Sequence, residues 1–136
     1  METTFINQNT KGTIVEEGLA SLESTAEDMA VFMEDPDGND ELGSFYDYGL
    51  SFDYVAADDD GEEAFNAVKD GTSPEFDGYY RYQISWGGPS EEVRFYKNST
   101  EYVYLDWFCG VGFDVSNTDW AEWLRDWFTD CEMINF

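Results

Sequence analysis

Two stretches with helical periodicity enclose a central region in which apolar and polar residues alternate. Apolar residues recur every three or four positions from 13 to 34 and again from 120 to 131. Between these stretches, alternation predicts strands at 45–55 and 79–86, and the chain returns as a strand at 91–97. β-branched and aromatic residues predict a fourth strand at 102–111. A turn at 87–90 joins the second strand to the third as an antiparallel hairpin. The pattern predicts an α+β fold, in which a four-stranded antiparallel sheet carries an N-terminal and a C-terminal helix on one face.

The length of 136 residues suits a single domain spanning 1–136. Residues 1–12 are predicted to form a polar arm, and residues 57–78 an acidic connection without clear periodicity. No apolar run approaches the roughly 18 residues of a membrane span, and the N-terminus lacks the basic and apolar regions of a signal peptide. We therefore expect a single acidic domain in the cytoplasm.

Each predicted helix has an apolar stripe that we expect to face the core. Ser116 and Asp119, at the start of the C-terminal helix, have the spacing of a capping box. Cys109 of a predicted strand and Cys131 of this helix are both expected to be reduced core residues. Arg81 and Arg94 lie on adjacent predicted strands, where they should offset neighbouring carboxylates. The predicted stripe of the first helix consists of Val15, Leu19, Leu22, Ala26, Met29, Ala30 and Met33, and that of the second of Trp120, Trp123, Leu124, Trp127, Phe128 and Cys131.

The chain is strongly acidic. It has 31 Asp and Glu against 6 Lys and Arg, a formal net charge of −25. Self-repulsion on this scale opposes compaction, yet aromatic residues make up 18% of the chain, far more than in a disordered acidic segment. Histidine, the commonest general base and metal ligand, is absent from the sequence. We therefore expect a folded, non-enzymatic protein without cofactor or metal whose negative field has a function.

The carboxylates form rows on both predicted helices. Since a helix turns by about 100° per residue, the first row lies within roughly 20° of one line, nearly a right angle from the apolar stripe. The second row spans about 80° beside the tryptophans. A loop after the first helix adds a third group. The predicted partner-binding residues are Glu16, Glu23, Glu27 and Glu34 of the first row, Asp119, Glu122, Asp126 and Asp130 of the second row, and Asp35, Asp37, Asp40 and Glu41 of the loop.

The spacing of the first row is compatible with mimicry of a nucleic acid. At about 1.5 Å per residue, its gaps are roughly 10, 6 and 10 Å, comparable with distances between phosphates on one strand. A rigid protein with such a row could occupy the basic groove of a DNA-binding protein. Three alternatives stay open: an immunity or antitoxin protein that plugs a basic nuclease toxin, a halophile-adapted acidic domain, and ordinary solvated helix faces.

The loop at 35–46 resembles a calcium-binding loop only in its first half. Asp35, Asp37 and Asn39 match the first three ligands of an EF-hand, but Asp40 stands where glycine is needed and Tyr46 where glutamate is needed. The acidic run at 58–63 is typical of a solvated turn. The sequence therefore predicts no metal site.

Two stretches carry a resemblance to known proteins. The run from Gly78 to Tyr96, which includes Tyr82-Gln83-Ile84-Ser85-Trp86-Gly87-Gly88-Pro89-Ser90, and the run from Tyr104 to Phe108 resemble small acidic proteins of phages and mobile elements. The overall acidity resembles the DNA-mimic inhibitors of CRISPR and restriction systems. This resemblance implies an anti-CRISPR or anti-restriction inhibitor whose partner is a basic DNA-binding protein, a CRISPR-Cas effector first and a restriction nuclease second. It implies no direct binding of nucleic acid or membrane and leaves a homodimer open.

Overall fold

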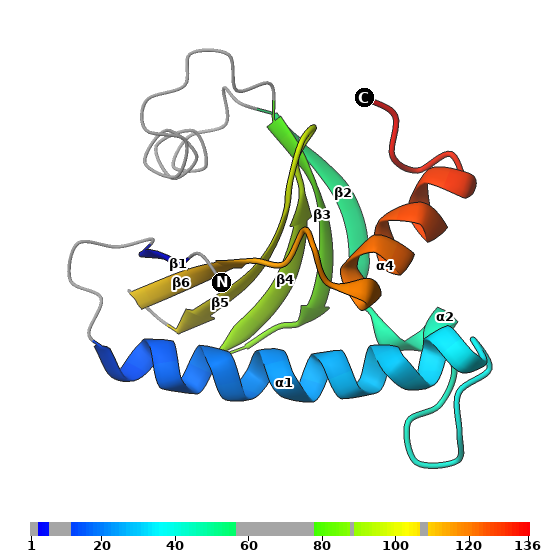
Figure 1. Ribbon diagram of the computed structural model, residues 1–136, viewed down its shortest axis with the longest axis horizontal. Helices are drawn as coiled ribbons and strands as arrows, with labels where there is room; N and C mark the ends of the chain where they lie inside the picture. Colours follow the sequence, from blue (N-terminus) through cyan, green and yellow to red (C-terminus); the bar gives the residue numbers. More distant parts are fainter. Residues whose placement is uncertain (1–2, 6–11, 57–77, 88, 107–108) are drawn as a thin grey trace.

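A computed structural model describes residues 3–5, 12–56, 78–87, 89–106 and 109–136. In this part of the chain, an antiparallel six-stranded sheet has the order β1-β6-β5-β4-β3-β2 (Figure 1). The strands are β1 (Thr3–Phe5), β2 (Ser51–Ala56), β3 (Gly78–Ser85), β4 (Ser90–Phe95), β5 (Thr100–Asp106) and β6 (Cys109–Asp114). The helices are α1 (Gly12–Glu34), α2 (Phe45–Tyr48) and α4 (Asp119–Asp130).

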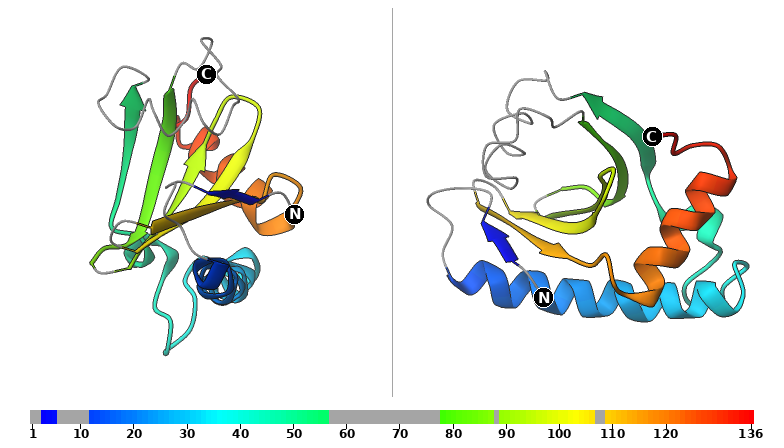
Figure 2. Two further views of the ribbon diagram at one scale, coloured as in Figure 1. Left: turned by 90° about the vertical axis from the view of Figure 1, so that its left-hand side faces the viewer. Right: turned by 45° about the horizontal axis from the view of Figure 1, so that its top comes forward.

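Helices α1 and α4 pack on the same face of a strongly curved sheet (Figures 1 and 2). One cluster of buried residues joins Met29 and Phe32 of α1 to Leu124 of α4 and to the sheet. The strand residues in this cluster alternate along each strand, as Tyr82 and Ile84 do on β3, because successive side chains of a strand point to opposite faces. The predicted α+β class, with an antiparallel sheet and both helices on one face, is confirmed.

The predicted number of four strands is wrong. The stretch predicted as one strand at 102–111 belongs to two antiparallel strands, β5 and β6, which pair with Asp106 opposite Cys109. Residues 102–108 contain no glycine, proline or asparagine, so the sequence carries no turn signal there. Within the predicted polar arm, Thr3–Phe5 forms β1 and pairs with β6. The predicted connection at 57–78 lies, except for Gly78, outside the described residues.

Helix α2 occupies the first part of a segment that was predicted as a strand. Ser44 stands at its N-cap, and the buried Phe45 contacts the rings of Trp123 and Trp127 at centroid distances of 5.1 and 5.0 Å. Only from Ser51 onward does the chain join the sheet, opposite Gln83. Contact with α4 therefore overrides the alternating pattern of 45–50.

The buried stripe of α1 is rotated relative to the prediction. Leu19 and Met33 are each 38% exposed, whereas Gly18 and Thr25 are buried. A Cβ on Gly18 would come within 2.8 Å of Val111 and 2.9 Å of Phe113, so glycine allows the helix to approach β6 closely. Hydrophobicity alone does not mark Gly18 or Thr25 as core positions. The buried stripe consists of Ile14, Gly18, Leu22, Thr25, Met29 and Phe32.

The start and end of α4 also differ from the prediction. Thr118, not Ser116, is the N-cap residue, and the Ser116 hydroxyl instead accepts a hydrogen bond from the Thr100 amide at 2.9 Å. Cys131 is exposed at the C-cap and is not a core residue. The side chain of Cys109 lies outside the described part of the structure.

Gly49 provides a first test of the packing between α2 and the sheet. An added Cβ would lie 2.2 Å from Cε1 and 2.4 Å from the hydroxyl of Tyr82, a buried ring. We expect Gly49→Ala to lower the free energy of unfolding by about 1–3 kcal/mol in urea denaturation, because the ring must move. In a Tyr82→Leu background the same substitution should cost clearly less, and an equal cost in both backgrounds would contradict the clash.

Tyr82 itself provides a second test. Its buried hydroxyl oxygen has no hydrogen-bond partner among the described residues. Because a buried hydroxyl without a partner is penalised, we expect Tyr82→Phe to raise the free energy of unfolding by about 1 kcal/mol. The matched control is Tyr102→Phe, which removes a hydroxyl that donates to Glu91 Oε1 at 2.8 Å and should destabilise the protein. A loss of stability in Tyr82→Phe equal to that of the control would disprove the assignment.

Candidate functional site: a helical acidic surface

The α1 row projects directly away from the domain. Glu16, Glu23, Glu27 and Glu34 all lie within α1 and are exposed. At about 100° per residue, their mean direction is roughly 165° from that of the buried stripe, not the right angle that the sequence predicted. The difference follows from the rotated stripe. The row therefore occupies the outermost line of the helix, where a flat or concave partner could reach every carboxylate.

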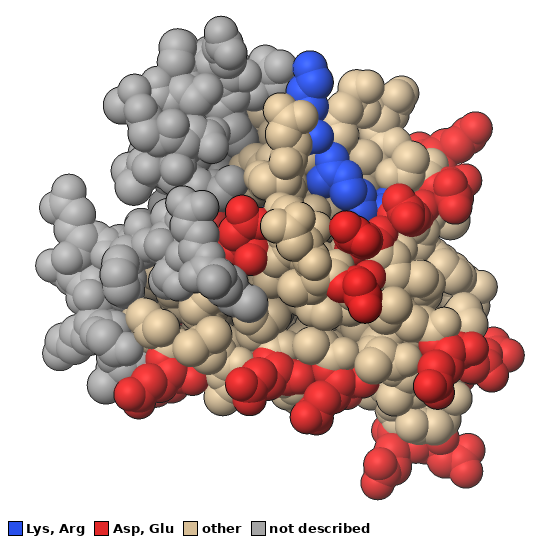
Figure 3. Space-filling model, in the orientation of Figure 1, with Lys and Arg blue, Asp and Glu red and all other residues tan. Residues whose placement is uncertain are grey.

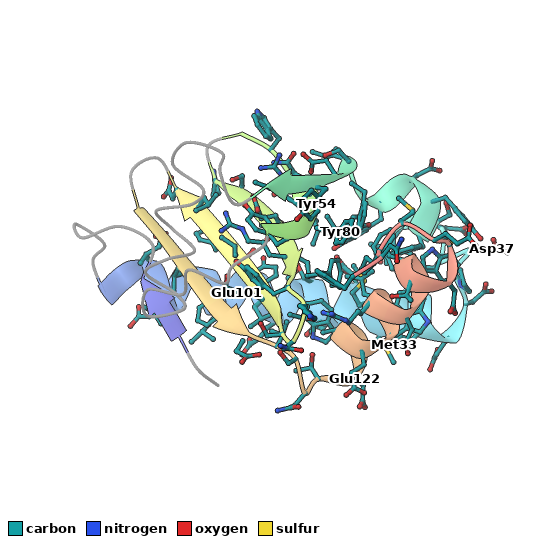
Figure 4. All side chains as sticks on the ribbon, turned by 90° about the horizontal axis from the view of Figure 1, so that it is seen from above. Met33, Asp37, Tyr54, Tyr80, Glu101 and Glu122 are labelled. Atoms are coloured by element: carbon teal, nitrogen blue, oxygen red, sulfur yellow. The ribbon has the colours of Figure 1, made fainter. Side chains whose placement is uncertain are left out.

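The α4 row has the same relation to its own core face. Trp120, Ala121, Leu124 and Phe128 are buried, and the row lies roughly 170° from their mean direction. All of its carboxylates are exposed, and Figure 4 shows Glu122 projecting from α4 away from the sheet. No basic residue lies in the last turn of α4, where the helix dipole favours a cation. The members of the row are Asp119, Glu122, Asp126 and Asp130.

The loop after α1 holds its carboxylates on a defined turn. Asp35 Oδ1 accepts a hydrogen bond from the Asp37 amide at 3.0 Å, and Asn39 Oδ1 accepts one from the Leu42 amide at 2.7 Å. A bridge between Asn39 and Gly43 closes the turn. Figure 4 shows Asp37 at the outer end of this loop. The loop carboxylates predicted as partner contacts, Asp35, Asp37, Asp40 and Glu41, are all exposed.

The two rows and the loop together form what we call the helical acidic surface. Figure 3 shows carboxylates along α1 at the lower edge, on the loop at the lower right and on α4 at the right. The members of this surface are Glu16, Glu23, Glu27, Glu34, Asp35, Asp37, Asp40, Glu41, Asp119, Glu122, Asp126 and Asp130. All the predicted site residues therefore lie on the helix layer of the domain.

Within the described part of the chain, the ion pairs join carboxylates outside the helical acidic surface. Arg81 pairs with Asp53, its cross-strand neighbour, at 2.7 Å, and Arg94 pairs with Glu92 at 2.7 Å. The expectation that these two arginines offset carboxylates in the sheet is thus confirmed. Burial lowers the pKa of Arg125, the one basic residue of α4.

Arg125 is directed to the sheet and not to the carboxylates of its own helix. Its guanidinium donates to the carbonyl oxygens of Tyr96, Lys97 and Ser99 at 2.7, 3.0 and 3.2 Å. A further bond reaches the Thr100 hydroxyl at 3.2 Å. These bonds tie α4 to the connection between β4 and β5. The guanidinium of Arg125 therefore does not pair with the carboxylates of the α4 row.

Other carboxylates have structural roles. Asp28 accepts a hydrogen bond from the Tyr48 hydroxyl at 2.8 Å, which links α1 to α2. Burial, and secondarily the Asp28 carboxylate, raises the pKa of Tyr48 well above its ordinary value. Glu91 accepts bonds from Tyr102 at 2.8 Å and from Ser85 at 3.0 Å. Asp28 and Glu91 therefore have structural roles that the exposed carboxylates of the helical acidic surface do not share.

Sequence reasoning missed a buried charged cluster on the sheet face opposite the helices. Glu92, Arg94 and Glu101 are only 2%, 2% and 3% exposed. Arg94 Nε donates to Glu92, and the Tyr96 hydroxyl donates to Glu101 Oε1 at 3.2 Å. The sequence does contain a signal for this cluster: charged residues stand at the alternate positions Glu92 and Arg94 of β4, and Glu101 of β5 lies opposite Arg94. Because these groups are buried, the cluster supports the fold and offers no surface to a partner.

An open pocket of about 280 Å³ lies beside Asn135 and Phe136, and the helical acidic surface contributes none of its described lining residues. Among the described residues, its lining is mainly aromatic and contains no Asp or Glu side chain. The Tyr80 hydroxyl in its wall is bonded to the main chain of Asn135 at 3.1 and 3.2 Å, and Figure 4 shows Tyr54 beside Tyr80. The lining residues are Tyr54, Tyr80, Lys97, Asn135 and Phe136.

Comparisons of the chain with protein-family models, with curated proteins and with solved structures find no match. None of the helices in the described ranges combines the length and apolar character that crossing a membrane requires. Over the same ranges, no three side chains of the metal-binding types gather closely enough to hold an ion. The run at 58–63 lies outside them.

Proposed function

We propose that the protein is a nucleic-acid mimic that inhibits a host defence nuclease by occupying its DNA-binding surface. A CRISPR-Cas effector is the first candidate target and a restriction enzyme the second, in the cytoplasm of the host cell. One observation carries the proposal: the carboxylates of the helical acidic surface are exposed, and no ion pair among the described residues involves them. A surface built for stability would alternate the two signs of charge.

The dimensions of α1 support mimicry of a polyanion. From Glu16 to Glu34 the row extends about 27 Å, at 1.5 Å per residue, which is somewhat less than one turn of B-DNA. Its gaps correspond to about every second or third phosphate along one strand. Arginines and lysines that line a DNA-binding groove could pair with these carboxylates in place of phosphates.

The rigidity of the scaffold supports the proposal as well. Each row lies on a helix that packs on the sheet, and hydrogen bonds within the loop hold the third group. A partner therefore does not have to order the carboxylates on binding, a cost that a disordered acidic tail would incur. The negative field would also steer a basic partner toward the surface and speed association at low salt.

The deciding experiment measures DNA binding by a candidate nuclease in the presence of this protein. A purified CRISPR-Cas effector or restriction enzyme is titrated with the protein, and binding to labelled DNA is followed by mobility shift. We expect DNA to be displaced, less efficiently as salt rises. A nuclease that forms a complex with the protein yet keeps its DNA affinity would exclude mimicry and favour the immunity alternative. Cooperative unfolding only in molar salt would favour halophilic adaptation.

A further inference from the structure

An exposed group of aromatic rings borders the helical acidic surface. Tyr46 is 70% exposed, and its ring centroid lies 5.8 Å from that of Trp127, which is 5.4 Å from that of Trp123. Both tryptophans are partly exposed. We call Tyr46, Trp123 and Trp127 the aromatic seam. It lies where α2 meets α4, and the buried Phe45 supports both tryptophans from the core side.

Carboxylates line the aromatic seam along α4. Asp126 follows Trp123 by three positions and Asp130 follows Trp127 by three, so each carboxylate is a surface neighbour of one ring. On α2, Asp47 is exposed directly after Tyr46. The seam therefore combines ring surfaces with negative charges. Partly exposed tryptophan and tyrosine are the residues that most often dominate binding energy at protein interfaces.

The chemistry of the seam fits a guanidinium group better than an ammonium group. A guanidinium is planar, weakly hydrated and able to stack on a ring while its edge binds a carboxylate, whereas an ammonium is a compact and strongly hydrated charge. The protein uses this combination in its own interior. The guanidinium carbon of Arg94 lies 4.7 Å from the ring centroid of Tyr79 while Nε binds Glu92.

We infer that the aromatic seam is the docking site for an arginine side chain of the partner, with the guanidinium against Trp127 or Tyr46 and its edge paired with a bordering carboxylate. Charge complementarity selects the occupant, because a neutral apolar partner would have to desolvate Asp47, Asp126 and Asp130 without compensation. The inference deepens the proposed function, on which it rests for the basic nature of the partner. It adds a preference for arginine over lysine that depends on the ring of Tyr46, beyond the preference that pairing with carboxylates alone gives.

Two synthetic peptides of equal charge, nona-arginine and nona-lysine, test the inference by isothermal titration calorimetry at one fixed salt concentration. We expect the protein to bind nona-arginine about tenfold more tightly, since ring contacts with a cation contribute on the order of this factor. Tyr46→Ala should reduce the preference to about twofold while leaving the affinity for nona-lysine unchanged. Tyr46→Phe, which keeps the ring, should retain the preference.

The matched control is Trp86→Ala. Trp86 is 74% exposed between β3 and β4, so this variant also removes one exposed aromatic side chain, but one that belongs to neither α2 nor α4. It should bind both peptides as the unmodified protein does. Equal affinity for the two peptides, or an equal loss for both in Tyr46→Ala, would overturn the inference. A clear arginine preference with no effect on the DNA binding of any nuclease would keep the inference and reject the proposed function.

Discussion

Replacing Arg94 with methionine is expected to lower the free energy of unfolding by about 3–5 kcal/mol, because it leaves buried carboxylates without their cation. Methionine fills a similar volume but carries no charge. Glu92 and Glu101 would stay on the same buried sheet face, and Glu92 would lose a bond of 2.7 Å from the guanidinium. Urea denaturation followed by circular dichroism measures the loss.

Two further variants separate the charge effect from a loss of packing. The double variant E92L/R94M removes both partners of the buried pair and should recover part of the stability, since only Glu101 then stays buried without the cation. Arg81→Met breaks the more exposed pair with Asp53, whose side chains are 24% and 45% exposed, and should cost at most about 1 kcal/mol. A cost for Arg94→Met no larger than that for Arg81→Met would refute the importance of burial.

Local periodicity predicted the elements that bury one regular face. The patterns at 13–34 and 120–131 identify α1 and α4 to within a few residues, and alternation together with a turn signal identifies the hairpin of β3 and β4. These predictions are correct because the hydrophobic pattern that indicates each element lies within that element. The α+β class follows from their order alone.

The errors arise where distant contacts decide the structure. Gly18 is buried because its missing side chain lets α1 approach β6, a fact that no local pattern encodes. Phe45 forms part of a short helix because it packs against tryptophans of α4, more than seventy residues later. The division of 102–111 into β5 and β6 likewise depends on pairing.

The same distinction applies to the candidate site. Helical spacing correctly predicted that the α1 and α4 carboxylates form rows, because each row lies within one helix. It could not predict that the α1 row faces directly outward, since this depends on the true buried stripe. The sequence could not predict the aromatic seam, because its rings come from two elements, α2 and α4, that meet only in the folded domain. Exposure of Tyr46 could be known only once the strand prediction for this segment was corrected.

Neutralising the α1 row should weaken binding to the nuclease target about 100-fold, if each of several surface ion pairs contributes a modest share. The variant is E16Q/E23Q/E27Q/E34Q, which keeps side-chain size and helix propensity. Its fold should persist with unchanged or slightly higher stability, because removing like charges relieves repulsion. Dissociation constants from calorimetry at two salt concentrations should also show a weaker salt dependence for the variant.

A pair of double variants shows whether position or total charge matters. E23Q/E27Q removes neighbouring charges from the outward line of α1, whereas E17Q/E132Q removes the same charge from exposed positions outside the helical acidic surface. Binding through a defined surface requires that the first weaken the complex and the second leave it nearly unchanged. Equal losses would mean that net charge alone attracts the target. An unchanged affinity in the quadruple variant would exclude the α1 row from the interface with the target. The α4 row and the loop would then remain as candidate contacts, because they lie on other elements and keep their carboxylates in this variant.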